Sequence, residues 1–391
     1  MKVLFQSRKT VFTVPGGDTI QMIKTREYLA HLGITADIST ELEPDLAAYD
    51  IVHLFNLVRP QEAYLQAANA RRWGRKVALS TIYVSYAEYE KKMRGGLAGI
   101  ASKLLDPGQT EYLKVAARAW RNREYSKGTA ALLLHGYREL QERVLDMTDV
   151  LLPNSASEMR RLVNDFPGAL KKPFVIVPNA FDRKLFAGRP AASAPEIEKY
   201  RGCVLCVARI EGLKNQLNLV RAMRGLPWPL VLIGRQAPNH ARYLDRIRAE
   251  AGTDVHILGP VEHAMLPQYY QAARVHTLVS WMETTGLSSL EAGAMGCQLV
   301  ITDKGDTRDY FRDYAFYCDP ASVESIRAAV ITAYISPPDP GLKDYLSSSF
   351  TWDKTALKTL EGYSLLLGPG RSAVSALNDS VEAVLAGRMV A

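Results

Sequence analysis

Short hydrophobic runs alternate with amphipathic stretches along the first half of the chain. Within the amphipathic stretches, such as residues 62–73, apolar residues recur at the spacing of a helix that is buried on one side. The short runs predict strands at residues 2–5, 35–39, 51–55, 77–81, 150–152 and 174–177. Strands that alternate with helices are typical of a parallel sheet covered on both faces.

The second half of the chain repeats this pattern from a new start. We expect helices at residues 215–224 and 243–251. The expected strands are residues 202–208, 229–233, 256–258, 276–279 and 299–302. A stretch rich in Ala, Pro and Gly, residues 187–195, is typical of a linker between the halves.

The pattern therefore predicts an α/β protein with two Rossmann-like domains that face each other across a cleft. We place the first domain at residues 1–190 and the second at residues 196–349. Residues 350–391 are expected to form helices that pack back across the domains, among them one at residues 371–387.

Composition narrows the class of protein only slightly. The chain has 391 residues, of which 47% are hydrophobic and 23% charged, as in ordinary globular proteins. No apolar run reaches the roughly 18 residues of a membrane span, and the first residues lack the apolar core of a secretory signal. We therefore expect a cytoplasmic protein. Cys203 and Cys206 match C-x-x-C but lie within a predicted strand, which disfavours a redox or metal role.

Positive charge is concentrated in one segment. The formal net charge is +7, and residues 91–127 hold nine basic and three acidic residues. This insert interrupts the alternation of strands and helices, and its helical part has apolar and basic faces. It fits peripheral contact with the inner face of a membrane, and it fits equally a solvated face that covers the first domain. No nucleic-acid-binding module accompanies the basic residues, so we expect no nucleic-acid partner.

Residues 279–305 carry the strongest chemical signal. A loop after a predicted strand contains Glu283 and Gly286, and the helix that follows contains Glu291. Carboxylates accept pairs of hydrogen bonds from hydroxyls, and the amides at a helix N-terminus bind anions, so the unit suits a nucleotide sugar. An alternative is that Ser288 and Glu291 form a capping box that only stabilises the helix.

Two further loops have residue types that suit a diphosphate. Arg209 and Lys214 follow the predicted strand 202–208, and Gly16 and Gly17 follow the first strand. Cations beside a helix N-terminus bind phosphate, and glycines let the backbone approach a ligand. The alternatives are solvated cations and an ordinary strand–helix turn. The sequence lacks the nicotinamide and P-loop signatures, Asp-x-Asp and metal-spaced histidines, so we expect neither a cofactor nor a metal.

Taken together, these motifs resemble the retaining GT-B glycosyltransferases of family 4, the glycosyl transferases group 1. The family pattern E-x7-E is similar to E-T-T-G-L at 283–287 followed by Leu290-Glu291-Ala292, and its R-x-x-x-x-K segment is similar to Arg209 and Lys214. Further similarities are the Gly-Gly loop and the segments V-P-N-A-F-D at 177–182, L-G-P-V at 258–261 and F-T-W at 350–352.

The resemblance implies a role for each matching residue. Glu291 would bind the ribose of the donor, and Glu283 the transferred sugar. Arg209 and Lys214 would bind the diphosphate and, with Glu283, would form the catalytic set. The remaining donor-binding residues would be Gly16, Gly17, Leu258, Gly259, Thr285, Gly286 and Leu287.

The sequence departs from the family pattern at one point that bears on catalysis. Many members have a histidine after the strand equivalent to residues 77–81, where this chain has Ser80-Thr81-Ile82-Tyr83. We therefore assign no catalytic histidine. Tyr83, together with His53 and Asn56 near the end of another predicted strand, is a candidate for the acceptor side, although a structural role is the alternative for His53.

The resemblance implies a metal-independent enzyme that moves a sugar from a nucleotide-sugar donor to a glycan or lipid-linked saccharide, in surface polysaccharide biosynthesis. The first domain would bind the acceptor and the second the donor. Two alternatives stay open: a nucleotide-sugar epimerase on the same scaffold, and a catalytically silent GT-B domain that binds glycan.

Overall fold

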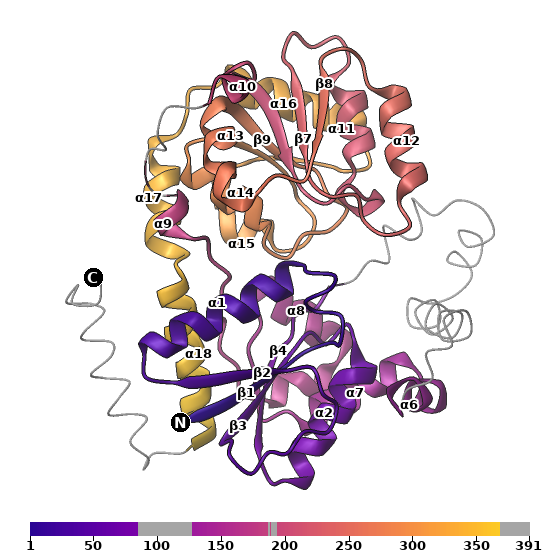
Figure 1. Ribbon diagram of the computed structural model, residues 1–391, viewed down its shortest axis with the longest axis vertical. Coiled ribbons are helices and arrows are strands. Elements are labelled where there is room, and N and C mark those ends of the chain that lie inside the picture. The colour runs from indigo at the N-terminus through magenta and orange to yellow at the C-terminus, as the bar shows by residue number, and fades with distance from the viewer. Residues whose placement is uncertain (85–126, 187, 189–193, 368–391) are drawn as a thin grey trace. The chain divides into compact units, whose positions relative to one another are not determined.

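The computed structural model describes residues 1–84, 127–186, 188 and 194–367. These residues form two compact α/β units (Figure 1). The first unit comprises residues 1–84, 127–179 and 352–367, and the second comprises the described part of residues 180–351. The predicted basic insert, apart from Lys127, and the predicted helix at 371–387 lie outside the described residues.

The first unit is built on a parallel sheet of five strands, as the alternation of strands and helices predicts. Each strand pairs with its neighbours in parallel. The strand order is β2 (Thr35–Ser39), β1 (Lys2–Gln6), β3 (Ile51–Phe55), β4 (Lys76–Ser80) and β5 (Val150–Leu151).

The strand predicted at residues 174–177 is wrong. This segment runs beside β5 and donates from Val177 to the carbonyl of Pro153, but it makes only one bridge, between Leu151 and Phe174. Pro153 has no N–H group to donate, so the ladder stops there.

Helices cover both faces of the first sheet (Figure 1). One core lies between the sheet and α2 (Pro60–Arg72), α7 (Tyr137–Met147) and α8 (Ala156–Asp165), and α6 (Lys127–His135) packs on α2. The second core lies between the sheet and two helices that are far apart in the sequence, α1 (Gly17–His31) and α18 (Trp352–Leu367).

The chain thus returns to its first unit at Trp352, the first residue of α18. Gly362 lets α18 approach the sheet closely, because a Cβ atom at this position would lie 2.4 Å from Cδ2 of Leu152. The segment F-T-W at 350–352 therefore leads into a helix that completes the first core.

The second unit contains a parallel sheet of six strands. The strand order is β11 (Phe316–Cys318), β10 (Gln298–Thr302), β9 (Ala273–Leu278), β6 (Cys203–Val207), β7 (Leu230–Ile233) and β8 (Val255–Gly259). This order makes β6 the neighbour of both β7 and β9, so the loops that follow these three strands meet at one edge of the sheet.

One face of the second sheet packs on α11 (Gln216–Met223), α12 (Ala241–Glu250) and α16 (Val323–Ile335). Against β9 and β10 pack α13 (Leu266–Ala272) and α14 (Leu287–Ala294), and α17 (Pro340–Ser349) lies on α14. The unit also contains the short helices α9 (Arg183–Phe186), α10 (Pro195–Glu198) and α15 (Thr307–Phe311).

The four cysteines are free and buried. Cys206 belongs to the core beneath α11, and burial raises the pKa of its thiol and that of Cys203 to about 12. Protonated thiols are poor nucleophiles and poor metal ligands, which agrees with the expectation that this C-x-x-C pair is structural.

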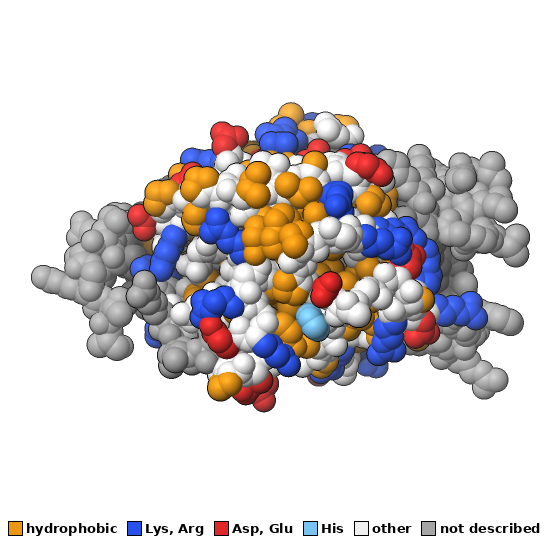
Figure 2. Space-filling view, turned by 90° about the horizontal axis from the view of Figure 1, so that it is seen from above, with side chains coloured by type: hydrophobic (Ala, Val, Ile, Leu, Met, Phe, Trp, Pro, Cys, Tyr) orange, Lys and Arg blue, Asp and Glu red, His pale blue; other side chains and the backbone are white. Residues whose placement is uncertain are grey.

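Charged side chains of both signs lie among hydrophobic ones on the face of the molecule shown in Figure 2. The described residues visible there therefore form no continuous surface of one sign. Among the described residues, no helix has both the length and the apolar character needed to cross a bilayer.

Candidate active site

Glu283 lies at the centre of the candidate site in the second unit. It belongs to the loop after β9, and its side chain is almost fully buried. Its Oε1 atom accepts hydrogen bonds from Nζ of Lys214 at 2.5 Å and from Oγ of Ser280 at 2.6 Å. A carboxylate held by a cation and a hydroxyl is fixed in orientation.

The backbone of Glu283 is held by the loop after β10. The amide of Asp306 donates to the carbonyl of Glu283 at 2.9 Å, and Glu283 and Gly305 form a parallel bridge. Gly305 has φ +95°, and a Cβ atom there would lie 1.9 Å from the carbonyl oxygen of Glu283. Only glycine allows the two loops to approach this closely.

The loop after β6 brings Lys214 to Glu283. The amide of Trp281 donates to the carbonyl of Leu213 at 2.9 Å, which ties this loop to the loop of Glu283. Asn215 is fully buried with φ +59°, and its side-chain amide donates to the carbonyls of Val279 and Pro320 at 3.1 and 2.8 Å. Asparagine tolerates this left-handed conformation, so the position of Lys214 is set by the residue after it.

Arg209 lies in the same loop and is exposed. Its Nη2 donates to Oε1 of Glu211 at 2.9 Å. Its carbonyl accepts from Nε2 of Gln216 at 2.8 Å, so both ends of the residue are held while the guanidinium still faces solvent. An anion can therefore reach Arg209 without displacing a buried group.

Glu291 does not form the capping box that its spacing from Ser288 suggests. Gly286, with φ +73°, is the N-cap of α14, so the helix begins at Leu287 and Ser288 is already inside it. The Glu291 carboxylate instead accepts from the hydroxyl of Tyr270 at 2.9 Å and pairs with Nε2 of His263 at 2.8 Å. Both carboxylate oxygens are thus held by side chains outside the helix, and the Glu291 side chain is 12% exposed.

The ends of β6, β7 and β8 are joined by close backbone contacts. The amide of Gly234 donates to the carbonyl of Gly259 at 2.8 Å, and a Cβ atom on Gly234 would lie 1.8 Å from the carbonyl oxygen of Ala208. Gly259, the last residue of β8, has φ +72°. Leu258 and Gly259 are thus brought to the same sheet edge as the loop of Arg209.

In the first unit, the loop that follows β1 is organised around Arg8, which is buried. Its guanidinium donates to both carboxylate oxygens of Asp18 at 2.8 and 3.2 Å, to Oγ1 of Thr10 at 2.9 Å and to the carbonyl of Val14 at 2.9 Å. A bidentate, buried pair of this kind gives the loop a fixed shape.

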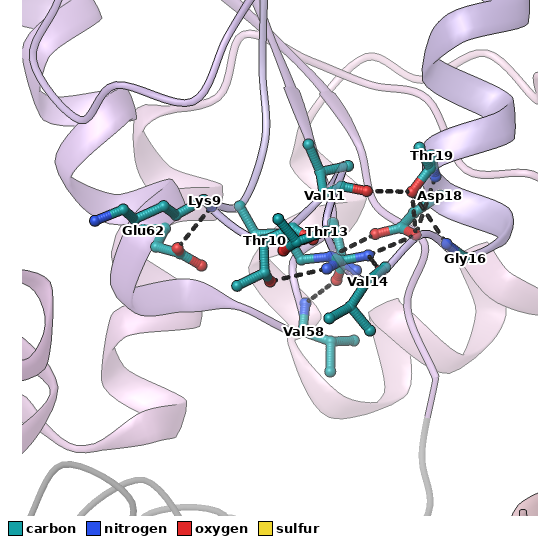
Figure 3. Close-up of polar contacts among 12 residues, drawn as sticks. Lys9, Thr10, Val11, Thr13, Val14, Gly16, Asp18, Thr19, Val58 and Glu62 are labelled. Atoms are coloured by element: carbon teal, nitrogen blue, oxygen red, sulfur yellow. Dashed lines mark hydrogen bonds and ion pairs between the residues drawn. The ribbon is translucent and has the colours of Figure 1, made fainter. Parts of the chain in front are cut away.

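Gly16 is the N-cap of α1, and Gly17 is its first residue. The Gly16 amide donates to Oγ1 of Thr19 at 3.0 Å, and a Cβ atom on Gly16 would lie 2.9 Å from Oδ1 of Asp18 (Figure 3). Asp18 pairs with Arg8, so the glycine makes room for that ion pair. The two glycines therefore have a structural reason to be present in addition to any role in binding.

His53, a candidate for the acceptor side, lies in the core of the first unit, which favours its structural alternative. Its ring nitrogens lie 2.7 Å from the hydroxyl of Tyr363 and 2.9 Å from Oγ of Ser80. Burial lowers the pKa of the imidazole to about 3, so the ring is neutral and structural.

Tyr83 is also mostly buried, and its hydroxyl donates to Asp165 at 2.6 Å. Asn56, with φ +83°, accepts from the amide of Val58 at 2.8 Å and is partly exposed. Of the three candidates for the acceptor side, Asn56 is the most accessible.

Glu158, which was not among the residues predicted from the sequence, is fully buried in the first unit. Its carboxylate accepts from the hydroxyl of Thr81 and from the amides of Tyr83 and Asn154 at 2.8 and 2.9 Å, so it shapes the segment after β4. The signal was present: Ser155 and Glu158 have the S-x-x-E spacing, and Ser155 caps α8.

Comparisons with known proteins identify a matching family model and related sequences. Residues 192–343 match the family model described as "Glycosyl transferases group 1". The chain is 27% identical over 197 residues to an O-antigen chain mannosyltransferase B of Escherichia coli, covering 45% of this chain and 50% of that protein. It is 30% identical over 261 residues to a D-inositol 3-phosphate glycosyltransferase of Pseudarthrobacter chlorophenolicus, covering 58% of each. The chain thus spans about half the length of the curated relatives it matches.

Two solved structures share the fold over nearly the whole chain. Sucrose-phosphate synthase from Thermosynechococcus elongatus has a TM-score of 0.67 and 15% identity, covering 94% of this chain and 99% of that one. Anabaena HepE, solved in complex with UDP-glucose, has a TM-score of 0.59 and 13% identity, covering 99% and 100%.

The fold is that of the GT-B glycosyltransferases. Residues 192–343 match the glycosyl transferases group 1 model, which confirms the resemblance seen in the sequence. The matched range contains both carboxylates and both cations of the candidate site.

Proposed function

We propose that the protein is a retaining glycosyltransferase that moves a sugar from a nucleotide-sugar donor to a glycan or lipid-linked saccharide. The observation that carries this proposal is the pairing of Lys214 with Glu283 at 2.5 Å, inside the domain that matches the group 1 family. Arg209 and Glu291 complete the set. Two cations and two carboxylates suit a ligand with an anionic diphosphate and several hydroxyls.

The donor would lie along the edge formed by the loops after β6, β8 and β9. Lys214 and Arg209 would bind the diphosphate, and the carboxylate of Glu291 would accept from the ribose hydroxyls. The backbone at Leu258 and Gly259 would meet the base. Thr285, Gly286 and Leu287 would line the donor site beside α14.

Glu283 would hold the hydroxyls of the transferred sugar. Its interactions with Lys214 and Ser280 link the sugar end of the donor to the diphosphate end. A fixed carboxylate preorganises the sugar for reaction, which is how positioning lowers a barrier.

The reaction we propose needs neither a metal nor a nucleophile from the protein. The bond from the anomeric carbon to the leaving phosphate oxygen breaks, and a bond to the acceptor oxygen forms on the same face. The acceptor proton passes to the leaving phosphate. Negative charge develops on the nucleoside diphosphate, where Arg209 and Lys214 stabilise it. Among the described residues, no cluster of three or more His, Cys, Asp or Glu side chains suits a metal.

The choice of donor and acceptor rests on relatives. The HepE structures contain UDP or UDP-glucose, and one relative is named as an O-antigen chain mannosyltransferase. These names support a nucleotide-sugar donor and an acceptor in surface polysaccharide biosynthesis. Peripheral membrane contact through residues 91–127 would bring the enzyme to a lipid-linked acceptor.

One assay tests the proposal. The purified protein is incubated with a panel of UDP- and GDP-sugars, with and without oligosaccharide and lipid-linked acceptors, and nucleotide release and sugar products are followed. We expect nucleoside diphosphate release that depends on acceptor. Isomerised donor without acceptor would indicate an epimerase. Donor or glycan binding without turnover would indicate a silent domain, and either result would overturn the proposal.

A further inference from the structure

Arg235 lies directly beside Arg209 at the edge of the second sheet. The register of β6 and β7 pairs Val204 with Leu230 and Val207 with Ile233. The pairing continues past the strand ends, because Ile210 and Gln236 form a parallel bridge. The same register therefore makes Arg209 and Arg235 neighbours across the two chain segments. The backbones of neighbouring strands lie about 5 Å apart.

The alternation of side chains along β6 and β7 indicates that both arginines lie on the same face of the sheet. Val204, Cys206, Ala208 and Ile210 all pack into the core that faces α11, α12 and α16. Because side chains alternate along a strand, Arg209 lies on the opposite face. Leu230 and Leu232 belong to the same core, so alternation continued past the end of β7 would bring Arg235 to the opposite face, next to Arg209.

Like charges that face each other across two strands destabilise a sheet unless something compensates them. Arg209 is compensated by Glu211, and Lys214 by Glu283. Arg235 is exposed, and in the described part of the chain it has no carboxylate oxygen within 4.0 Å. The edge thus carries one guanidinium more than its carboxylates neutralise, at the point where the proposed donor places its diphosphate.

We propose that Arg235 is a further donor-binding residue, whose guanidinium binds the diphosphate alongside Arg209. This inference rests on the proposed function. An anion with two phosphates accepts hydrogen bonds from both guanidinium groups and removes their mutual repulsion. Neither the family motifs in the sequence nor the R-x-x-x-x-K spacing marks this position, because it follows a different strand.

The test compares Arg235→Gln and Arg235→Lys with wild type in calorimetric binding of UDP, UMP and uridine, and of GDP, GMP and guanosine. We expect Arg235→Gln to bind the nucleoside diphosphates roughly tenfold more weakly, as for loss of one charged hydrogen bond. The loss should be smaller for monophosphates and absent for nucleosides. Arg235→Lys should recover part of the affinity. Arg248→Gln, at the far end of α12, is the matched control and should bind as wild type.

Two results would overturn this inference alone: wild-type affinity of Arg235→Gln for the diphosphates, or an equal loss for the free nucleosides, which would assign Arg235 to the base. Failure of wild type to bind any of the nucleotides would overturn the proposed function and this inference with it. Binding by wild type with a loss confined to the phosphorylated ligands supports both.

Discussion

Nζ of Lys214 lies 2.5 Å from Oε1 of Glu283, although 69 positions separate the two residues in the chain. They come from loops that follow β6 and β9, which are neighbours in the sheet. Their side chains are 19% and 7% exposed, so both charges are largely withdrawn from water. Such a pair contributes little net stability but costs much when only one partner is removed.

Replacing Lys214 with Met should therefore destabilise the second unit, because Glu283 is left as an uncompensated, buried carboxylate. We expect Lys214→Met to lower the free energy of unfolding by about 2–3 kcal/mol, measured by urea unfolding. Adding Glu283→Gln to this variant should recover part of the loss. Lys358→Met breaks an exposed pair with Glu361 and should cost less than about 1 kcal/mol. No recovery in the double variant would mean that the pair is not coupled.

The ribose assignment of Glu291 can be tested with a modified nucleotide. Glu291→Gln should weaken binding of the ribonucleoside diphosphate roughly tenfold, because the carboxylate is a stronger acceptor for hydroxyls than an amide. It should leave the affinity for the 2′,3′-dideoxy analogue nearly unchanged, since that ligand has no hydroxyl to lose. Calorimetry on both proteins with both ligands gives the coupling free energy between the Glu291 carboxylate and the ribose hydroxyls. Equal losses for the two ligands would show that Glu291 acts through the helix or through His263.

His53 should make the first unit sensitive to acid. Burial lowers the pKa of its imidazole from 6.5 to about 3, so only the unfolded state takes up a proton between these values. The stability that His53 contributes in its neutral form is therefore lost as pH falls below 6.5, by about 2 kcal/mol at pH 5. We expect the free energy of unfolding of wild type, measured in urea, to fall between pH 7 and pH 5. The fall should exceed that of His53→Gln by about 2 kcal/mol. Parallel losses in both proteins would contradict the assignment.

The periodicity of the sequence was sufficient to predict most strands. The strands at residues 35–39 and 51–55 have the bounds of β2 and β3. Both halves form parallel sheets with helices on each face, as the alternation indicates. The exception at residues 174–177 arose because Pro153 lacks the N–H that the ladder needs, and an apolar run alone does not show this.

The sequence could not give the partners of the site residues. The alternative that Glu291 caps its own helix stayed open, because nothing in the local sequence shows that His263 and Tyr270 lie beside it. The adjacency of Arg209 and Arg235 also depends on strand order, since β6 and β7 are neighbours in the sheet. The sequence motifs identify the loops of the candidate site. The strand order determines which side chains of these loops contact one another.

In the proposed function, Glu283 holds the hydroxyls of the transferred sugar. The most direct measurement is acceptor-dependent release of nucleoside diphosphate by wild type, Glu283→Gln and Glu324→Gln, the last of which changes an exposed carboxylate at the start of α16. We expect activity in wild type and Glu324→Gln, and a loss of kcat/KM of at least about 100-fold in a folded Glu283→Gln. Near-normal turnover by Glu283→Gln would contradict this role of Glu283.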